Sequence, residues 1–469
     1  MPTRGRSANG IRVGIGEGGG YGKMLAQMIV HGQSEYDTWQ FDPRRITSFA
    51  GLEFTAAKSI EDYQEEFVWH LPHEHRPAGR PAKTTPLYPI LRDRGAEFGV
   101  INGWERTLFY KPTPEFDVEL SWRFPNWHDV VAQEVASLQQ GVGFAELSGF
   151  NRLRITGTDP MGWLDTLTCS RVPAAPGKIG LCYFLTAGGN TAMEAAVVEL
   201  DDGSVWFSSA AAAQDHDRDW LTDHLPVDTD LRLESLTDAH TTLVIAGPHT
   251  RDLLTSVSPR TDWSHGATRW LTVRRCSIGH VEVVAMAVSF SGEQAVELHV
   301  PNTQLHAVFG LLIEAGRAFD LGLFGNHAIE SMRLEKGYCQ WKAELITEFN
   351  PIEAGLARFV DWNKPFRGKD GLERQLRAGN RRELAMLRID GDRAPAHEGE
   401  TVFSHGQPVG IVMSGAWGHR TDQNLAFAYL EPTVAGTGTE LEVLLIGEPA
   451  PGDRDRALLV RSRAPSASR

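Results

Sequence analysis

Residues 289–301 read SFSGEQAVELHVP, and the interpretation of the whole chain starts from this stretch. It begins like a strand, turns at Gly292, and places Glu293 and Glu297 four positions apart before apolar residues resume. A carboxylate held beside a turn can accept two parallel N–H bonds, the bidentate arrangement best known for arginine. Taken alone, the stretch favours two ordinary surface charges on a hairpin.

The bulk composition describes a soluble globular protein of two to four domains. The chain has 469 residues, 41% of them hydrophobic, and a formal net charge of −14. That charge disfavours nucleic acid or an anionic membrane as partner, and no apolar run has membrane-spanning length. The cysteines form no CxxC pair, which predicts reduced thiols and a cytoplasmic location. They are Cys169, Cys182, Cys276 and Cys339.

The N-terminal stretch IRVGIGEGGGYGKMLAQMIVHG contains Gly14, Gly16 and Gly19 in the order GxGxxG. This spacing occurs in dinucleotide-binding turns. However, the preceding strand is barely three residues long, and no second strand ending in an acid follows. A helix beginning near Tyr21 is predicted, and a glycine turn without a ligand remains an equal alternative.

The next segment, residues 36–115, contains three histidines in the string HLPHEHRP. His70, His73 and His75 are spaced closely enough to share an ion. No cysteine or carboxylate cluster joins them at zinc-like spacing, so the segment is interpreted as a connecting loop and no metal site is predicted.

A hairpin is predicted where two strands flank Gly188 and Gly189, in GKIGLCYFLTAGGNTAMEAAVVEL. Glu194 is the one acid in an otherwise apolar stretch of its second strand. A carboxylate among Ala and Val is costly to bury in its charged form, so it should face a cavity or have a raised pKa. It is therefore a candidate general acid–base; the alternative is an edge glutamate turned to solvent.

Apolar spacing predicts helices over HDVVAQEVASLQQ, residues 302–320 and residues 327–342. Strand-like segments then alternate from Arg381 to about Val460, as in a small β-barrel or sandwich. They are ELAMLRID, QPVGIVMSGAW, QNLAFAYLEP and LEVLLIG. The polar tail after about residue 462 is predicted to be disordered.

Several of these strings, in this order, resemble the glycine-cleavage T-proteins (aminomethyltransferases) and the folate-binding halves of dimethylglycine and sarcosine dehydrogenases. They are SFSGEQAVELHVP, the hairpin around Glu194, SMRLEKGYCQW, NPIEAGL and SGAWGHR. The glycine-rich N-terminal string is similar to the last turn and closing helix of the flavin domain in those dehydrogenases, most of which is absent here. The resemblance spans about residues 11–460.

The resemblance implies an α+β, T-protein-like folate-binding fold of three lobes around a central channel, with a C-terminal β-barrel and a short N-terminal flavin-domain remnant. The implied division is residues 1–35 for the remnant, 36–120 for a middle domain, 121–378 for the folate-binding domain, 379–462 for the barrel and 463–469 for the tail.

The resemblance also implies the site. Tetrahydrofolate would be the cofactor, with Glu297 and Arg333 gripping its pterin. Phe290 and Trp341 would pack the ring, and Glu194 would manage the proton. Two further residues are assigned to the cofactor, Glu293 and Tyr183, while Glu353 matches a family position of uncertain role.

The chain departs from the family at three places. Phe290 stands where the family usually has tyrosine, Ala295 where it has glycine, and Glu194 where it has aspartate. Losing a hydroxyl with a buried partner costs on the order of 1–3 kcal/mol. An altered folate affinity, or another one-carbon chemistry, is therefore expected.

The predicted function is transfer of a methyl or methylene group between a small N-, O- or S-methylated substrate and tetrahydrofolate, including demethylation. A second hypothesis is an accessory folate-binding subunit that completes a separate flavoprotein, which would supply FAD. A third is a folate fold repurposed for unrelated chemistry.

Overall fold

The computed structural model describes residues 15–31, 34, 38–391, 394–447 and 456–459. The chain divides into two units, residues 1–47 and residues 48–469, and each is described by itself. The five-part division expected from sequence stays a prediction. All candidate site residues lie in the second unit.

In the first unit, α1 (Ile15–His31) is the main element. The predicted helix thus begins six residues earlier than expected, so Gly16 and Gly19 lie inside it. Glycine inside a helix costs about 1 kcal/mol relative to alanine, which is why the sequence pattern placed the start of the helix after these glycines. The predicted strand over residues 11–13 and Gly14 lie outside the described residues.

The second unit contains a six-stranded sheet ordered β10-β11-β12-β9-β3-β13, antiparallel except for the β3–β13 pair. Its strands are β3 (Val142–Leu147), β9 (His240–Ala246), β10 (Thr272–Ile278), β11 (Val281–Ala287), β12 (Ala295–Pro301) and β13 (Leu321–Leu323). Gly292, with φ +74°, makes the predicted turn between β11 and β12. The sheet places Glu297 on a central strand.

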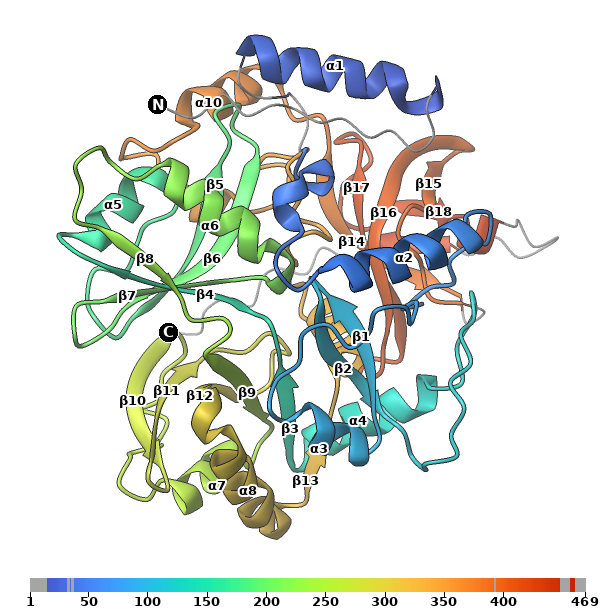
Figure 1. Cartoon of the computed structure of the whole chain (residues 1–469). Coiled ribbons are helices and arrows are strands. Elements are labelled where there is room, and N and C mark those ends of the chain that lie inside the picture. The colour runs from blue at the N-terminus through green and yellow to red at the C-terminus, as the bar shows by residue number, and fades with distance from the viewer. Residues whose placement is uncertain (1–14, 32–33, 35–37, 392–393, 448–455, 460–469) are drawn as a thin grey trace. The chain divides into compact units, whose positions relative to one another are not determined.

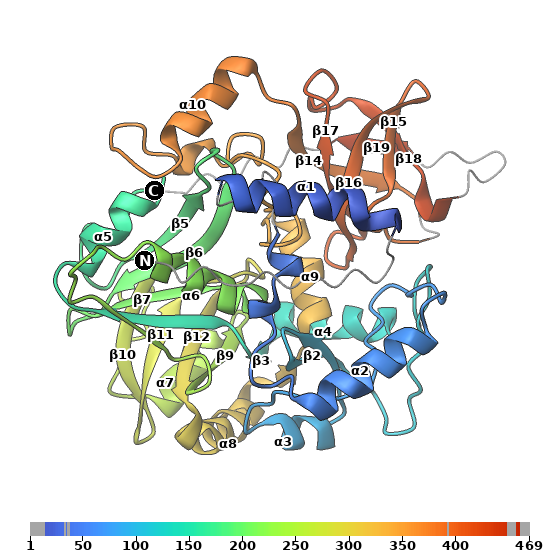
Figure 2. The same cartoon turned by 45° about the horizontal axis from the view of Figure 1, so that its top comes forward.

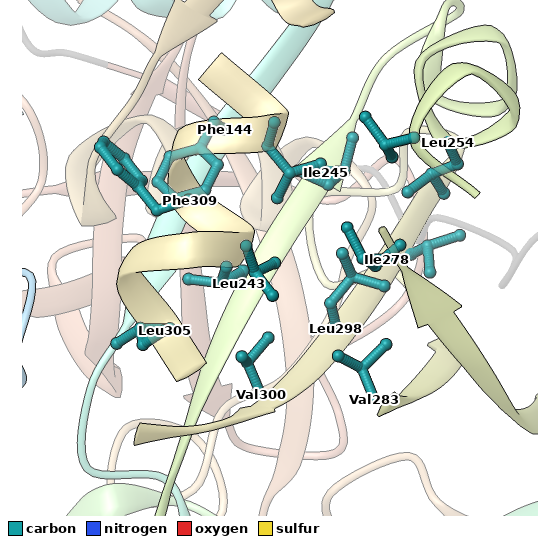
Figure 3. Packing of buried hydrophobic residues seen from close by; sticks show 14 of the residues in the cluster. Phe144, Leu243, Ile245, Leu254, Ile278, Val283, Leu298, Val300, Leu305 and Phe309 are labelled. Atoms are coloured by element: carbon teal, nitrogen blue, oxygen red, sulfur yellow. The ribbon is translucent and has the colours of Figure 1, made fainter. Parts of the chain in front are cut away.

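Alternate residues of β12 face opposite sides of this sheet. Val296, Leu298 and Val300 pack into a core with α7 (Thr250–Val257) and α8 (Leu305–Gly316). Figure 3 shows this packing, with Phe309 and Leu305 of α8 over the strands. Glu297 and His299 therefore point to the other face.

A five-stranded antiparallel sheet is ordered β5-β6-β7-β4-β8. Its strands are β4 (Asn151–Thr156), β5 (Ile179–Leu185), β6 (Thr191–Glu199), β7 (Val205–Ser209) and β8 (Arg232–Ser235). One face packs on α5 (Pro160–Leu167) and α6 (Gln214–Asp223) through a buried apolar cluster. The predicted hairpin is present, and Gly189 is required in it because a Cβ there would lie 2.3 Å from the Leu372 amide.

The remaining helices and a hairpin of the second unit lie outside these two sheets. They are α2 (Leu52–Gln64), α3 (Tyr88–Asp93), β1 (Ala96–Ile101), β2 (Trp104–Tyr110), α4 (His128–Gln140), α9 (Asn326–Glu335) and α10 (Lys369–Ala378). A buried cluster joins α4, α9 and β2 to one end of the six-stranded sheet. This packing fixes α9 beside the sheet that carries Glu297.

The C-terminal strands close into a barrel ordered β14-β17-β16-β15-β18-β19. They are β14 (Glu383–Asp390), β15 (Thr401–Ser404), β16 (Gln407–Gly418), β17 (Gln423–Leu430), β18 (Glu440–Val443) and β19 (Arg456–Leu459). Figures 1 and 2 show it in orange to red. The barrel interior is filled by small and aliphatic side chains, which confirms the prediction of a barrel.

The helix predicted over residues 327–342 ends at Glu335. Gly337 adopts φ +69°, and the amides of Tyr338 and Gly337 donate to the carbonyls of Arg333 and Leu334. This is the Schellman arrangement that terminates helices at glycine. Residues 338–345 therefore leave the helix axis, and Trp341 does not share a helix face with Arg333.

The α2 helix buries none of its residues. Large apolar side chains on α2 and the turn after it are exposed, and we call them the α2 apolar face: Leu52, Ile60, Tyr63, Phe67 and Trp69. Phe67 is 91% exposed. Among the helices that the structure describes, none has the length and apolarity that a membrane span requires.

We expect Leu298→Ala to lower the free energy of unfolding by about 2–5 kcal/mol, because Leu298 has no exposed surface and its loss leaves a cavity under β12. Leu311→Ala, at a 38% exposed position of α8, is the control and should cost less than about 1 kcal/mol. Urea unfolding followed by circular dichroism measures both. Equal losses would show that the sheet does not depend on this core.

Candidate active site

The five-stranded sheet and the open six-stranded sheet pack against one another through an apolar cluster that contains residues of both. Ile179, Val198 and Trp206 come from the five-stranded sheet, and Val284 and Met286 come from the six-stranded sheet. The helices α7 and α8 lie on the opposite side of the six-stranded sheet in both views (Figures 1 and 2). Beyond this cluster the inner faces turn polar, and the predicted acids lie there.

Glu194 lies on β6 directly opposite Tyr183 of β5. The Tyr183 hydroxyl donates to Glu194 Oε1 at 2.8 Å. Burial raises the pKa of Glu194 to about 7, the hydrogen bond from Tyr183 opposes this, and the nearby charge of Glu344 adds to it. Burial and Glu194 also hold the pKa of Tyr183 well above its usual range. Glu194 is therefore a carboxyl that can exchange a proton near neutral pH.

Glu297 lies on β12 between Met286 and Val244. Its side chain is 24% exposed, and burial raises its pKa to about 7 while Arg152 opposes the shift. Within the described part of the chain, no hydrogen bond reaches this carboxylate. It is a recessed acceptor that remains open to a donor.

Arg152 lies on β4 and is 1% exposed. Its guanidinium donates to Thr242 Oγ1 at 2.6 Å and to the His240 carbonyl at 3.5 Å. Burial lowers the pKa of Arg152 to about 10, and Glu297 opposes that shift. The sequence NRLRIT could have indicated this residue, because its period of two sets Arg152 and Arg154 on the face opposite Leu153 and Ile155.

Arg333 makes no hydrogen bond or ion pair with Glu297 among the described residues, and its contact with a pterin stays a prediction. Its guanidinium has no exposed surface and donates to Glu330, to Glu344 at 3.0 Å, to the Tyr338 carbonyl at 2.9 Å and to Ser414 Oγ at 3.1 Å. Although burial alone would lower it, Glu330 and Glu344 raise the pKa of Arg333 above its usual value. Arg333 therefore fastens residues 338–344 and barrel strand β16 to α9.

Glu293 is also used within the protein. Its carboxylate pairs with Arg420, which also pairs with Glu335 at the end of α9. These bonds fix the turn before β12 to the loop after β16, so Glu293 has a structural contact and its role at the cofactor stays a prediction.

The predicted aromatic residues divide between two environments. Trp341 is 4% exposed and packs with Tyr183 in a buried cluster, so its ring offers little surface to a ligand. Phe290 is 38% exposed, and its ring is inclined by 26° to that of Tyr338 with centroids 6.5 Å apart. The Phe290 ring is therefore open to a ligand and the Trp341 ring is largely covered, and the contact of either ring with a pterin stays a prediction.

Two further residues near the predicted ones are Glu344, which was not anticipated, and Glu353, which was expected only as a family position of uncertain role. Glu344, with no exposed surface, accepts from Arg333 and Ser414 and raises the pKa of Glu194 through its charge. Glu353 is buried and accepts from the Asn350 and Arg381 amides, which gives it a structural role. No sequence signal marks Glu344, because its partners lie 11 and 70 positions away.

The three histidines of HLPHEHRP contact different partners. His73 packs against the rings of Trp127 and His327, and burial lowers its pKa to about 4. His75 Nδ1 accepts from the Val100 amide, and His70 lies 3.9 Å from Glu74. Nowhere in the part that the structure describes do three or more His, Cys, Asp or Glu side chains gather as metal ligands.

The fold and the site define a class of protein: two sheets packed face to face, each carrying a carboxyl with a raised pKa, followed by a closed barrel. Residues 87–364 match the GCVT N-terminal domain, and residues 382–454 match the glycine cleavage T-protein C-terminal barrel domain. The chain therefore belongs to the glycine cleavage T-protein family. Residues 31–85 match the FAD dependent oxidoreductase central domain.

Individual relatives agree with this assignment. Mitochondrial dimethylglycine dehydrogenase of Mus musculus is 31% identical over 449 residues, which are 95% of this chain and 51% of that protein. An aminomethyltransferase of Thermoanaerobacter sp. (strain X514) is 23% identical over 70% of this chain and 89% of its own length. The chain spans about half the length of the dehydrogenases it matches.

A solved structure shows the same fold. The aminomethyltransferase T of the glycine cleavage system from Bartonella henselae superposes with a TM-score of 0.68 at 20% identity, over 81% of this chain and 97% of that one. The predicted α+β, T-protein-like fold with a C-terminal barrel is confirmed.

We expect Glu194→Gln to remove part of the pH dependence of stability. The folded protein keeps the Glu194 proton up to about pH 7, whereas an unfolded chain releases it above about pH 4.3. The folded state thus binds more protons between these values, and the free energy of unfolding falls as pH rises through this window. Relative to the wild type, the variant should gain on the order of 1–3 kcal/mol between pH 5 and pH 8.

Urea unfolding at pH 5 and pH 8 measures this difference, with Glu199→Gln on the same strand as control. If the free energies of unfolding of the wild type and of Glu194→Gln change by the same amount between pH 5 and pH 8, Glu194 is not the titrating group.

Proposed function

We propose that the chain is a tetrahydrofolate-dependent one-carbon transferase acting on a small N-, O- or S-methylated substrate. The proposal rests above all on Glu297, a recessed carboxylate with a pKa of about 7 and no hydrogen-bond donor among the described residues. Membership of the T-protein family supports it independently. The same site could work in the direction of demethylation.

The residues present fit a reduced pterin in part. Glu297 would accept from the ring N3–H and the 2-amino group, a pair of parallel donors that matches a carboxylate. The exposed face of Phe290, beside Tyr338, would lie against the ring. The proposal does not depend on Arg333 or Glu293, because both already bond to other side chains of the protein. When bound, tetrahydrofolate supplies the amine nitrogens that carry the one-carbon group.

Glu194 would accept and return a proton during the transfer. The Tyr183 hydroxyl fixes the orientation of Glu194 Oε1 and stabilises its charged form, while burial stabilises the neutral form. These opposed effects keep the carboxyl close to half-protonated at neutral pH. Such a group can take the proton of a substrate amine and return it, which contributes typically 10²–10⁴-fold to rate. Positioning of two substrates between the sheets would supply the rest.

A second candidate, an accessory subunit of a flavoprotein, is favoured by a separate observation. Residues 31–85 match a domain named for FAD-dependent oxidoreductases, and the matched region includes the whole α2 apolar face. Monomeric proteins rarely expose large contiguous apolar patches without a partner. The relatives of twice the length include a 4-methylaminobutanoate oxidase that forms formaldehyde. A separate flavoprotein would pass its one-carbon product to the folate site here.

We expect Glu297→Ala to weaken tetrahydrofolate binding by roughly tenfold to a hundredfold, the loss that follows removal of a charged hydrogen-bonding group. Glu194→Gln should leave binding within about threefold of the wild type and lower the turnover of methylated amines by roughly 10²–10⁴-fold. Calorimetric titration measures binding, and a screen of N-, O- and S-methylated compounds measures turnover.

Glu293→Gln is the matched control, because this acid of the same hairpin is bound to Arg420 and should not change affinity. A wild type whose melting temperature does not respond to tetrahydrofolate would remove the pterin assignment and favour the repurposed fold.

If the chain acts with a flavoprotein, we expect the native protein to purify as a yellow complex with a second polypeptide. A triple variant, Tyr63→Ser, Phe67→Ser and Trp69→Ser, should lose that polypeptide while keeping its own fold, since none of these side chains is buried. Val227→Ser, at a 91% exposed loop position elsewhere, should retain it. A colourless wild type that turns over substrate alone would exclude this function.

A further inference from the structure

Three polar groups without a hydrogen-bond partner lie together on the inner faces of the two sheets. The Glu297 carboxylate receives no bond from the described residues, and Arg152 Nε and His299 Nε2 are buried without partners in the same described part. His299 Nε2 lies 3.6 Å from Glu297 Oε2. Buried polar groups are almost always satisfied, so two that are not, beside a partly exposed carboxylate without a donor, indicate a ligand edge.

Arg152 and Glu297 carry opposite charges and interact electrostatically without a direct contact. Each is the one charge that shifts the pKa of the other. Nevertheless no ion pair or hydrogen bond joins them among the described residues. An arginine that only neutralised a buried acid would be expected in direct contact with it, usually through two parallel bonds. The separation leaves both groups free to bond with a third.

A chain of hydrogen bonds fixes the protonation of His299. The Thr242 hydroxyl oxygen accepts from Arg152 at 2.6 Å and lies 3.3 Å from His299 Nδ1. Since the hydroxyl accepts from the guanidinium, its single hydrogen is available for Nδ1. Burial and the charge of Arg152 hold the pKa of His299 well below its usual range, so the ring is neutral and carries its proton on Nε2, the nitrogen near Glu297.

The resulting edge offers a donor from Arg152 Nε–H and an acceptor pair from Glu297. The edge of a 2-amino-4-oxopyrimidine ring offers the complement: a carbonyl oxygen, the N3–H and a 2-amino group. We propose that Arg152 donates to the ring carbonyl while Glu297 accepts from the two N–H groups, and that His299 is a positioning residue that holds Glu297 charged. This inference rests on the proposed function and adds the residues that would distinguish a ring with a carbonyl at this position from other rings.

The probes are tetrahydrofolate and its 4-amino analogue, in which the ring carbonyl is replaced by an amino group. The analogue would bring a donor against the Arg152 donor, so the wild type should bind tetrahydrofolate more tightly. Arg152→Met should reduce this preference by roughly tenfold to a hundredfold, because a charged donor to the carbonyl is lost. Calorimetric titration of both probes gives the ratio of affinities without any measurement of turnover.

Two more variants separate recognition from folding. Arg152→Lys keeps the charge but has no Nε–H fork, so it should fold as the wild type does and still lose the preference. Arg154→Met is the matched control: it lies on the same face of β4, 40% exposed and paired with Asp202 and Glu234, and should leave the ratio unchanged.

His299 is tested by the pH dependence of tetrahydrofolate binding. The groups facing Glu297 are His299 on its own strand, Arg152 of β4 and His240 and Thr242 of β9. Binding needs the Glu297 anion and is lost as pH falls through its pKa. His299→Leu should move the midpoint of this loss to higher pH by raising that pKa, and His299→Gln, which keeps a donor, should restore it.

The outcomes are distinct. A wild type that binds neither probe overturns the proposed function. A wild type that binds tetrahydrofolate without a preference over the analogue, or an Arg152→Lys variant that keeps the preference, overturns the inference and leaves the proposed function standing. If tetrahydrofolate binding is lost at the same pH in His299→Leu and in the wild type, the role of His299 is overturned.

Discussion

The structure depends on a few ionisable groups buried between two sheets and not fully neutralised there. Glu194 has one hydrogen bond, from Tyr183, and Glu297 has none among the described residues. Burying a carboxylate without donors is costly, so the group shifts its pKa toward neutrality. Both acids reach about 7. Because each acid lies on a face of one sheet that is turned toward the other sheet, both are candidates for contact with a ligand.

Other buried charges of the same region are neutralised completely, and they hold the site together. Arg333 joins α9 to residues 338–344 and to β16 of the barrel. Arg420, from the loop after β16, reaches Glu335 and Glu293. The barrel is thus attached at two points, to α9 with residues 338–344 and to the turn before β12, the strand that carries Glu297. The charge of Glu344, held by Arg333 and Ser414, acts directly on Glu194.

Local patterns predicted the local structure. The turn at Gly292, the hairpin at Gly188 and Gly189 and the alternating barrel strands depend on neighbouring residues, and each is present. The lone acid in an apolar strand identified Glu194 by the same reasoning. The bonds of Arg333 and Glu293 within the protein could not be predicted, because those to Ser414 and Arg420 span 81 and 127 positions. A resemblance of motifs transfers residue types, but only the folded chain shows which charges already have partners.

The departures from the family bear on whether the site still suits a pterin. Phe290 is 38% exposed and lies beside the Tyr338 ring. Phenylalanine in place of the family's tyrosine therefore leaves no buried polar group without its hydrogen bond among the described residues. The penalty for a lost buried hydroxyl therefore does not apply to the free protein. Ala295 pairs with Ala246 and packs against the cluster that contains α4 and α9, where its methyl group is accommodated. Of the three departures, this leaves Glu194, whose side chain is longer by one methylene than the aspartate of the family and would move the carboxyl by that length. The scaffold around it, from Tyr183 to Glu344, is built to hold that group near neutrality, which favours a re-tuned transferase over a fold that has lost its reaction.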